Sequence, residues 1–327
     1  MHVTYFFRQP QPGFHSIEEL FATVIAALPS KVEATRYSVP RAGAAPASLL
    51  ANTRAARVHR NRINHVTGHI NYVVPALGRR TILTVHDVGS SFTGGPIRNM
   101  LVRLLWYWLP AFSVKRITVV SAFSRSELGA VIPFAEKKIH VVHNPCSPKV
   151  VYQNKTFDSE KPRILHVGTK PNKNLDRTAR ALRGIPCTLV IVGVLSEAQK
   201  HMLASCGIDV ENHRDLTYDA MLSLYAGCDL LCFASTYEGF GMPVIEANGI
   251  GRPVVTGRAA SIPEVANDAA CLVNPYDPDA IRAGVLRIIQ EPGYRETLIR
   301  NGLTNVERFR PEKIAGHYVR LYREICD

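Results

Sequence analysis

The stretch "YEGFGMPVIEA", residues 237–247, sets a glutamate at each end of a glycine-rich turn. Glu238 and Glu246 are separated by seven residues, which include two glycines and Pro243, and the apolar run 229–235 comes directly before them. Proline suits the first turn of a helix, and glycine marks a turn. This order indicates a buried strand, a tight turn and the start of a helix.

The backbone amides and the two carboxylates of this turn could bind different groups of a ligand. The backbone amides of Phe240, Gly241 and Met242 are expected to point toward the positive end of the helix, which is a natural site for phosphate or sugar oxygens. Carboxylates accept hydrogen bonds from vicinal hydroxyls, as in ribose recognition. One of Glu238 and Glu246 could therefore hold a ribose and the other a sugar. Alternatively, both acids merely complement the helix dipole.

A second candidate phosphate site is "GTKPNKNL", residues 168–175. Gly168 ends a predicted strand, Lys170 and Lys173 follow, and Asn174 can cap the next helix. An anion would relieve lysines placed at a helix N-terminus, although solvated loop lysines are the simpler interpretation. Neither stretch contains G-x-G-x-x-G or a G-x4-G-K-[ST] loop, which argues against nicotinamide cofactors and nucleoside triphosphate hydrolysis.

The chain as a whole predicts two α/β domains. Its 327 residues exceed one ordinary core, and apolar strands alternate with helical patterns in both halves, as in parallel sheets. Strands are expected over residues 2–7, 62–66, 81–87, 116–121, 138–144, 163–168, 187–193, 229–235, 252–257 and 270–274. Residues 145–161 lose the periodicity and form the expected linker. Ligands bind at the carboxyl ends of such strands, so these motifs are expected to converge on a cleft between the domains.

Composition narrows the class of protein. No apolar run approaches the roughly 20 residues that span a bilayer, and the N-terminal sequence lacks a signal-peptide core. The 7 cysteines are scattered and form no metal-ligand pattern, which favours a reducing cytoplasm.

The net charge differs between the two halves of the chain. Residues 1–150 hold 18 Lys and Arg against 6 Asp and Glu, whereas residues 151–327 hold 21 Lys and Arg and 21 Asp and Glu. The first half is therefore expected to meet an anionic partner, unless it is an ordinary basic surface.

The motifs, taken in order, resemble one enzyme family. "EGFGMPVIE" matches the E-x7-E signature of the retaining glycosyltransferases of family 4, which have the GT-B fold. The 50 or so residues around it look like that family's donor domain, and "HVGTKPNKNL" is similar to its phosphate-binding segment. "TVHD", "VVSAFSRSEL" and "KIHVVHNP" resemble its N-terminal domain. The resemblance covers nearly the whole chain.

This resemblance implies two Rossmann-like, doubly wound domains that face a cleft. It implies an acceptor-side domain over residues 1–150 and a nucleotide-sugar donor domain over 151–310. A helix over residues 311–327 would pack back toward the first domain.

The resemblance also implies roles for single residues. Glu246 would hold the ribose hydroxyls of the donor, and Glu238 would contact hydroxyls of the transferred sugar. Lys173 would neutralise the diphosphate, helped by the amides of residues 240–242. Gly13 would let the backbone approach the diphosphate, and His86 would line the cleft near the anomeric carbon, unless it is a core histidine.

One position departs from the family. Family members commonly carry an arginine beside this lysine. Here Asn172 stands there, with Lys170 two positions earlier as the possible substitute, and Gly168 precedes both.

The family mechanism needs no protein nucleophile, because the acceptor hydroxyl attacks on the face that the leaving diphosphate vacates. Stabilising the charge of the diphosphate is then the main catalytic task. Lys173 and the helix-terminal amides suit this task without a divalent metal, so we expect a metal-independent hexosyltransferase without a cofactor. The donor is a UDP- or GDP-sugar that this sequence does not specify.

The acceptor is expected to be a saccharide or a lipid-linked glycan in cell-surface polysaccharide synthesis. Residues 97–116 set Trp106, Tyr107 and Trp108 among leucines and basic residues, which suits a membrane interface or, alternatively, a core helix. We expect a cytoplasmic enzyme, peripheral at the inner face of the membrane. The competing hypothesis is a non-enzymatic protein that binds nucleic acid through its basic half. Such binding predicts basic residues interleaved with exposed aromatics, whereas here the aromatics cluster in one helical stretch and no known nucleic-acid motif is present, so no nucleic-acid partner is expected.

Overall fold

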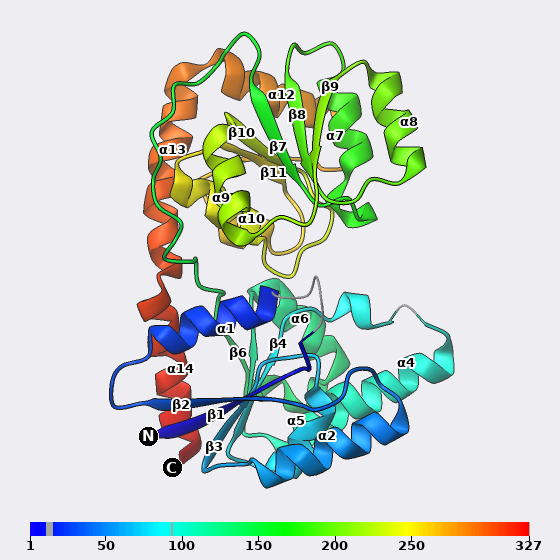
Figure 1. Ribbon diagram of the computed structural model, residues 1–327, viewed down its shortest axis with the longest axis vertical. Coiled ribbons are helices and arrows are strands. Elements are labelled where there is room, and N and C mark those ends of the chain that lie inside the picture. Colours follow the sequence, from blue (N-terminus) through cyan, green and yellow to red (C-terminus); the bar gives the residue numbers. More distant parts are fainter. Residues whose placement is uncertain (11–15, 93, 327) are drawn as a thin grey trace. The chain divides into compact units, whose positions relative to one another are not determined.

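The computed structural model describes residues 1–10, 16–92 and 94–326, which form two compact units (Figure 1). The first unit comprises Met1–Pro145 together with Pro311–Asp327, and the second comprises Cys146–Arg310. Gly13 lies outside the described residues. Each unit is an α/β layered structure.

Within the described residues, the first unit is built on a six-stranded parallel sheet. The strands lie in the order β2-β1-β3-β4-β5-β6, which leaves β2 and β6 at the edges. Their bounds are β1 (His2–Phe7), β2 (Glu33–Ser38), β3 (Ile63–Val66), β4 (Thr81–Val85), β5 (Arg116–Val119) and β6 (Ile139–Val141). Four of these strands are buried almost throughout, as expected for a parallel sheet that is covered on both faces.

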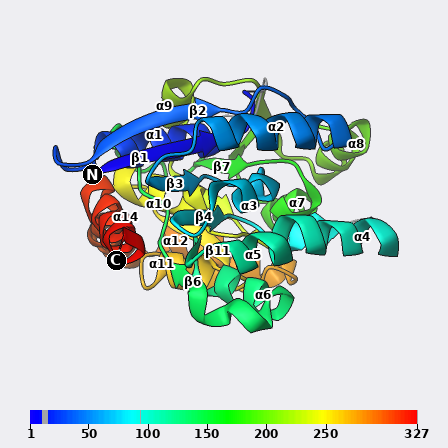
Figure 2. The same cartoon turned by 90° about the horizontal axis from the view of Figure 1, so that it is seen from below.

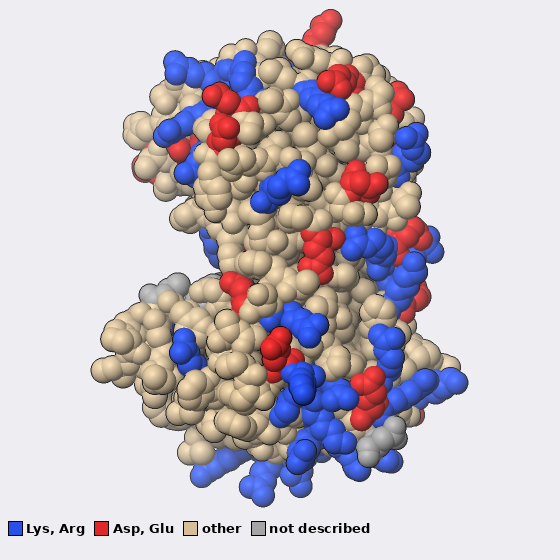
Figure 3. All heavy atoms as spheres, turned by 180° about the vertical axis from the view of Figure 1, so that it is seen from behind, with Lys and Arg blue, Asp and Glu red and all other residues tan. Residues whose placement is uncertain are grey.

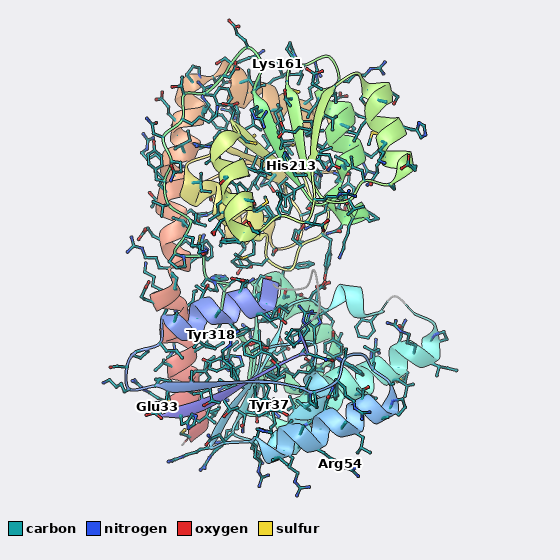
Figure 4. All side chains as sticks on the ribbon, in the orientation of Figure 1. Glu33, Tyr37, Arg54, Lys161, His213 and Tyr318 are labelled. Atoms are coloured by element: carbon teal, nitrogen blue, oxygen red, sulfur yellow. The ribbon has the colours of Figure 1, made fainter. Side chains whose placement is uncertain are left out.

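Helices cover both faces of this sheet (Figure 2). Helices α1 (Ser16–Ala26) and α14 (Pro311–Cys326) bury one core, and Tyr318 of α14, labelled in Figure 4, packs there against Phe21 and His65. The opposite core is formed with α2 (Pro46–Val58), α3 (Val74–Leu77), α4 (Pro96–Val102), α5 (Leu109–Ser113) and α6 (Ala122–Val131).

A chain of buried hydroxyls and one histidine fixes α14 to the sheet. The hydroxyl of Tyr322 lies 2.7 Å from that of Tyr5 and 2.6 Å from Nδ1 of His65. Nε2 of His65 lies 2.7 Å from Oγ1 of Thr84, which in turn lies 2.7 Å from Oγ1 of Thr118. All five side chains are buried, so each needs the partner that the next one supplies. This network ties residues near both ends of the sequence into one core.

The second unit, all of whose residues are described, contains a second six-stranded parallel sheet in the order β12-β11-β10-β7-β8-β9. Its strands are β7 (Arg163–Val167), β8 (Thr188–Val192), β9 (Asp209–His213), β10 (Leu230–Phe233), β11 (Val254–Gly257) and β12 (Cys271–Val273). Its helices are α7 (Leu175–Leu182), α8 (Glu197–Cys206), α9 (Tyr218–Gly227), α10 (Met242–Ile250), α11 (Ile262–Ala266), α12 (Pro278–Gln290) and α13 (Pro292–Val306). The apolar side chains of α7, α8 and α12 share one core, and those of α9, α10 and α11 share another.

The ten strands predicted from the sequence are confirmed, with ends that differ by up to three residues. Two further strands, β2 and β9, were missed. Both are edge strands whose side chains are largely exposed, so they lack the apolar run that identifies a buried strand.

The aromatic segment that follows Pro96 is helical. Within the stretch 97–116, for which a core helix was one alternative, the chain is helical from Pro96 to Ser113 and contains a π-helical turn over Arg103–Trp108. Tyr107 is buried, the indole N–H of Trp106 donates to the carbonyl of His69, and that of Trp108 donates to the carbonyl of Val131, each at 2.9 Å. Tyr107 is buried and the two tryptophans are partly buried against the core, as in the core-helix alternative, and the membrane interface stays a prediction.

Candidate active site

The turn between β10 and α10 is shaped by Gly241. This residue has a φ of +104° and caps the start of α10, and a Cβ atom there would lie 2.5 Å from Cδ1 of Ile262. Only glycine fits this conformation and this contact. Oγ of Ser261 donates to the carbonyls of Glu238 and Phe240, at 2.8 and 2.9 Å. The carbonyl oxygens of the turn are thus held on the side of α11.

Glu238 forms a shielded ion pair on this turn. One of its carboxylate oxygens accepts hydrogen bonds from Nζ of Lys173 at 2.6 Å and from Oγ of Ser235 at 2.7 Å. The side chains of Lys173 and Glu238 are only 20% and 12% exposed. The ammonium also lies 4.9 Å from the ring centre of Phe233, within range of a cation–π interaction. The structure therefore places opposite charges from two loops at one point.

Lys173 reaches this point because Gly168 makes room for it. Gly168 follows β7 with a φ of +93°, and a Cβ atom there would lie 2.8 Å from Cγ of Lys173. The buried Asn174 holds the loop by donating to the carbonyls of Ala234 and Pro275. Its φ of +63° is the left-handed conformation that asparagine tolerates well.

Asn172, at the position where the family that the sequence resembles commonly carries an arginine, joins two loops of the site. Its side-chain amide donates to the carbonyl of Tyr237 at 2.9 Å, and its own carbonyl accepts from the amide of Thr236 at 2.9 Å. These bonds fasten the lysine loop to the glutamate turn. Lys170 is exposed to solvent.

Glu246 lies one turn further along α10 and is 8% exposed. Its two carboxylate oxygens accept hydrogen bonds from Tyr218 at 3.1 Å and from Tyr225 at 2.9 Å. Burial raises the pKa of this carboxyl above its usual range, while the two tyrosine hydroxyls act in the opposite direction. A carboxylate oxygen can accept more than one hydrogen bond, so the pair of phenols orients Glu246 without saturating it.

His86 belongs to the first unit and follows β4. Its Nε2 lies 2.8 Å from the carbonyl oxygen of Thr67, and a Cβ atom on Gly68 would lie 2.9 Å from its ring. Burial lowers its pKa to about 4, so the ring is neutral at pH 7. Because a carbonyl only accepts, Nε2 carries the proton, which leaves Nδ1 as an acceptor.

Two charged side chains lie close enough to influence the charge on His86. Arg8 and Glu18 form a two-pronged ion pair, with N–O distances of 2.8 and 3.1 Å. Arg8 and His86 both directly follow strands, at the carboxyl edge where parallel sheets bind ligands.

The predicted site residues thus fall into two groups. One group lies around the carboxyl ends of β7 and β10 and the start of α10 in the second unit. It consists of Gly168, Lys173, Glu238, Phe240, Gly241, Met242 and Glu246. Lys170 is on the same loop, and His86 is in the first unit.

Sequence reasoning missed four polar residues of this site: Ser235, Ser261, Tyr218 and Tyr225. Ser235 stands three residues before Glu238, at the end of the strand, and that position could have indicated it. The tyrosines come from α9, and nothing in their spacing links them to Glu246.

Comparison with known proteins agrees with this arrangement. Residues 2–150 match the family model described as Glycosyltransferase Family 4, and residues 151–304 match that described as Glycosyl transferases group 1. Between them the two models span both units. The chain belongs to the family 4 glycosyltransferases.

Relatives of this glycosyltransferase include an O-antigen chain mannosyltransferase B of Escherichia coli, which is 28% identical over 84% of this chain and 78% of its own length. Two solved structures share the fold over 99% of this chain, each with 16% identity. They are sucrose-phosphate synthase from Thermosynechococcus elongatus, with a TM-score of 0.79 over 99% of that chain, and Anabaena HepE in complex with UDP and glucose, with 0.78 over 100%. The glycosyltransferase therefore has the GT-B fold.

No helix among the described residues is long and apolar enough to cross a membrane.

Proposed function

We propose that this glycosyltransferase moves a hexose from a nucleotide sugar to an acceptor hydroxyl with retention of anomeric configuration. The observation that carries the proposal is the Lys173–Glu238 ion pair beside the N-terminus of α10. A cation and helix amides suit a diphosphate, and a carboxylate suits sugar hydroxyls. The second unit would hold the donor and the first unit the acceptor.

In this proposal the donor diphosphate separates the ion pair. Lys173 turns from the carboxylate to the phosphates, and Glu238 becomes available to the hydroxyls of the sugar. The bond from the anomeric carbon to the diphosphate breaks, the acceptor oxygen bonds to that carbon, and the acceptor proton passes to a phosphate oxygen. Lys173 and the amides of residues 240–242 stabilise the leaving charge, the kind of contribution for which losing one group costs about a hundredfold in rate or more.

Glu246 would bind the ribose of the donor, oriented by Tyr218 and Tyr225. The relative from Escherichia coli is a mannosyltransferase, and HepE was solved with UDP and glucose. A UDP- or GDP-hexose is therefore the donor class that we propose, and polysaccharide synthesis is the proposed setting. No metal and no further cofactor are assigned a role.

An apolar ridge on the first unit supports a lipid-linked acceptor. On the segment from Pro96 to Ser113 most of the side chains that face solvent are large and apolar, and the exposed Phe112 stacks on Phe134 with ring centres 4.4 Å apart. The ridge consists of Ile97, Met100, Leu101, Leu104, Leu109, Phe112 and Phe134. Exposed Arg98 and Arg103 lie among these residues.

Lys and Arg side chains also gather on the first unit, in the lower part of Figure 3. Apolar side chains beside basic ones suit the boundary between acyl chains and anionic headgroups. We therefore propose that the ridge rests on an anionic membrane surface.

The test of the donor site is a thermal-shift screen of nucleoside diphosphates and nucleotide sugars, with and without EDTA. A ligand present at a hundred times its Kd stabilises the fold by about 2.7 kcal/mol. We expect UDP or GDP and one cognate nucleotide sugar to raise the melting temperature of the wild type but not of Glu246→Ala. The product configuration is then read by NMR. An inverted product would refute retention, and loss of turnover in EDTA that a divalent ion restores would refute metal independence.

A further inference from the structure

A pocket opens at the exposed edge of the first unit's sheet, beside β6. Its volume is about 390 Å³, within the range of small-molecule sites. The floor is β6 itself, with α14 on one side and α6 and the 3₁₀ turn Pro133–Lys138 on the other. The polar side chains that line it are Arg125, Lys137, His140, His317, Arg320 and Glu324. None of these belongs to the proposed donor site, which lies in the second unit.

The charge of this pocket is unbalanced. Arg125 comes from α6, Lys137 from the 3₁₀ turn and Arg320 from α14, so three separate elements each contribute a permanent cation. The one acid in the lining, Glu324, is already paired with Arg116 at 3.1 Å. Glu136 lines the neighbouring hollow that Arg125 also borders. The three cationic side chains are exposed, so each can reach an anion that enters the pocket.

His140 supplies the second and independent observation. Its neighbours Ile139 and Val141 pack toward the core shared with α6, so the alternation of the strand turns His140 toward α14. Its Nε2 is buried and has no hydrogen-bond partner among the described residues. Burial, followed by the charges of Arg116 and Arg125, lowers the pKa of this ring. Buried polar nitrogens in native proteins almost always have a partner, and none of the described residues supplies one to this nitrogen.

We propose that this pocket binds a phosphate group. Phosphate carries the negative charge that three cations require and has several acceptor oxygens for guanidinium forks and for His140. The phosphate could belong to a soluble phosphorylated sugar or to a lipid headgroup, and both offer the same oxygens. The site is independent of the donor site and of the reaction assigned to it.

The test measures binding of inorganic phosphate by NMR of the histidine imidazoles. We compare wild type with Arg320→Gln and Arg125→Gln, and Arg323→Gln is the matched control because it changes an exposed arginine on α14 outside the pocket. All four proteins, including the one called wild type in this comparison, carry the background substitution Lys173→Ala, which removes the lysine of the proposed donor phosphate site. Phosphate should shift the His140 signals and raise the pKa of that ring. The affinity should fall about tenfold or more in each pocket variant and stay unchanged in the control.

A second arm distinguishes the source of the phosphate. Glucose 6-phosphate is titrated in the same way, and vesicles of phosphatidylglycerol in phosphatidylcholine are sedimented with each protein. A headgroup site predicts that pelleting falls in Arg320→Gln and not in Arg323→Gln, whereas a soluble ligand predicts an effect on glucose 6-phosphate alone. Either result supports the proposal. Equal behaviour of Arg320→Gln and Arg323→Gln in every arm, or unmoved His140 signals, overturns it. A failed donor screen with intact phosphate binding here would refute the proposed function alone.

Discussion

The ammonium of Lys173 and the carboxylate of Glu238 lie 2.6 Å apart, although they belong to loops separated by 65 residues of sequence. In the proposed reaction these two groups bind different parts of one donor molecule. Their ion pair then competes with the donor for Lys173. Substituting Glu238 should therefore maintain or raise nucleotide affinity, whereas substituting Lys173 should lower it.

Glu238→Gln should lower turnover by about a hundredfold while UDP or GDP binds as tightly as before or more tightly. The amide loses the charge that holds Lys173, so the ammonium is released to the diphosphate, while the contact with the transferred sugar is weakened. Calorimetry with the bare nucleotide and steady-state kinetics separate the two effects. Lys173→Ala is the comparison, and it should lower both the nucleotide affinity and the turnover. If Glu238→Gln weakens nucleotide binding as much as Lys173→Ala does, the assignment of Glu238 to the sugar is wrong.

Tyr225→Phe should weaken nucleotide binding through Glu246. The substitution removes the 2.9 Å hydrogen bond that orients the carboxylate and that opposes the effect of burial on its pKa. The pKa of Glu246 should then rise further, so nucleotide affinity should begin to decline at a higher pH than in the wild type as the solution is acidified. Titration calorimetry from pH 7 to 5 measures this shift. Tyr152→Phe, on an exposed tyrosine of the same unit, is the control. An unchanged pH profile in Tyr225→Phe would contradict the role of Tyr225.

Acidification should destabilise both units before most carboxylates titrate. Burial lowers the pKa of His65 to about 3 and those of His86 and His166 to about 4. These values lie below the usual 6.5, so the unfolded chain binds more protons than the folded one below that pH. The free energy of unfolding should fall by about 1.4 kcal/mol per pH unit for each such histidine. The decline starts near pH 6.5 and ends near the folded pKa values.

Urea unfolding at intervals from pH 7.5 to 5 measures this effect. The first unit contains His65 and His86, and burial also lowers the pKa values of its His69, His140 and His317, so its transition should respond more strongly than that of the second unit, which contains His166. Curves that do not change across this range would show that these rings are not buried in the neutral form.

Met100→Glu combined with Phe112→Glu should reduce binding to anionic vesicles. Both side chains are more than half exposed on the apolar ridge, so the change places charge where acyl contact is proposed without opening a cavity. Sedimentation with phosphatidylglycerol vesicles at low salt measures the loss. Val194→Glu changes an exposed apolar residue of the second unit and is the control. Pelleting that is negligible for the wild type, or equal in all three proteins, would remove the membrane from the proposal.

How far the sequence predicts this molecule depends on whether a signal is local. Strand β10, the turn and α10 follow one another, so the apolar run, Gly241 and Pro243 identify them directly. Strands β2 and β9 gave no such signal, because an edge strand is held mainly by its neighbour and tolerates polar side chains on both faces.

The candidate site shows the same limit. Glu238, Glu246 and Lys173 were identified through motifs, but their partners could not be. Tyr225 is 21 residues from Glu246 and meets it only because α9 packs beside α10. For Trp106 and Trp108 the composition left a membrane surface and a core helix both open, because the partners of their indole N–H groups, the carbonyls of His69 and Val131, are set by the tertiary fold.

The return of α14 to the first unit also orders events during synthesis. The second unit is one uninterrupted segment, so it can complete its core as soon as residue 310 has left the ribosome. The first unit begins earlier and finishes later, because Tyr5 and His65 must wait for Tyr322 to satisfy their polar groups. Until then, the sheet face that α14 covers is an unfilled apolar surface in the nascent chain, and a chaperone that recognises such surfaces has its longest opportunity there.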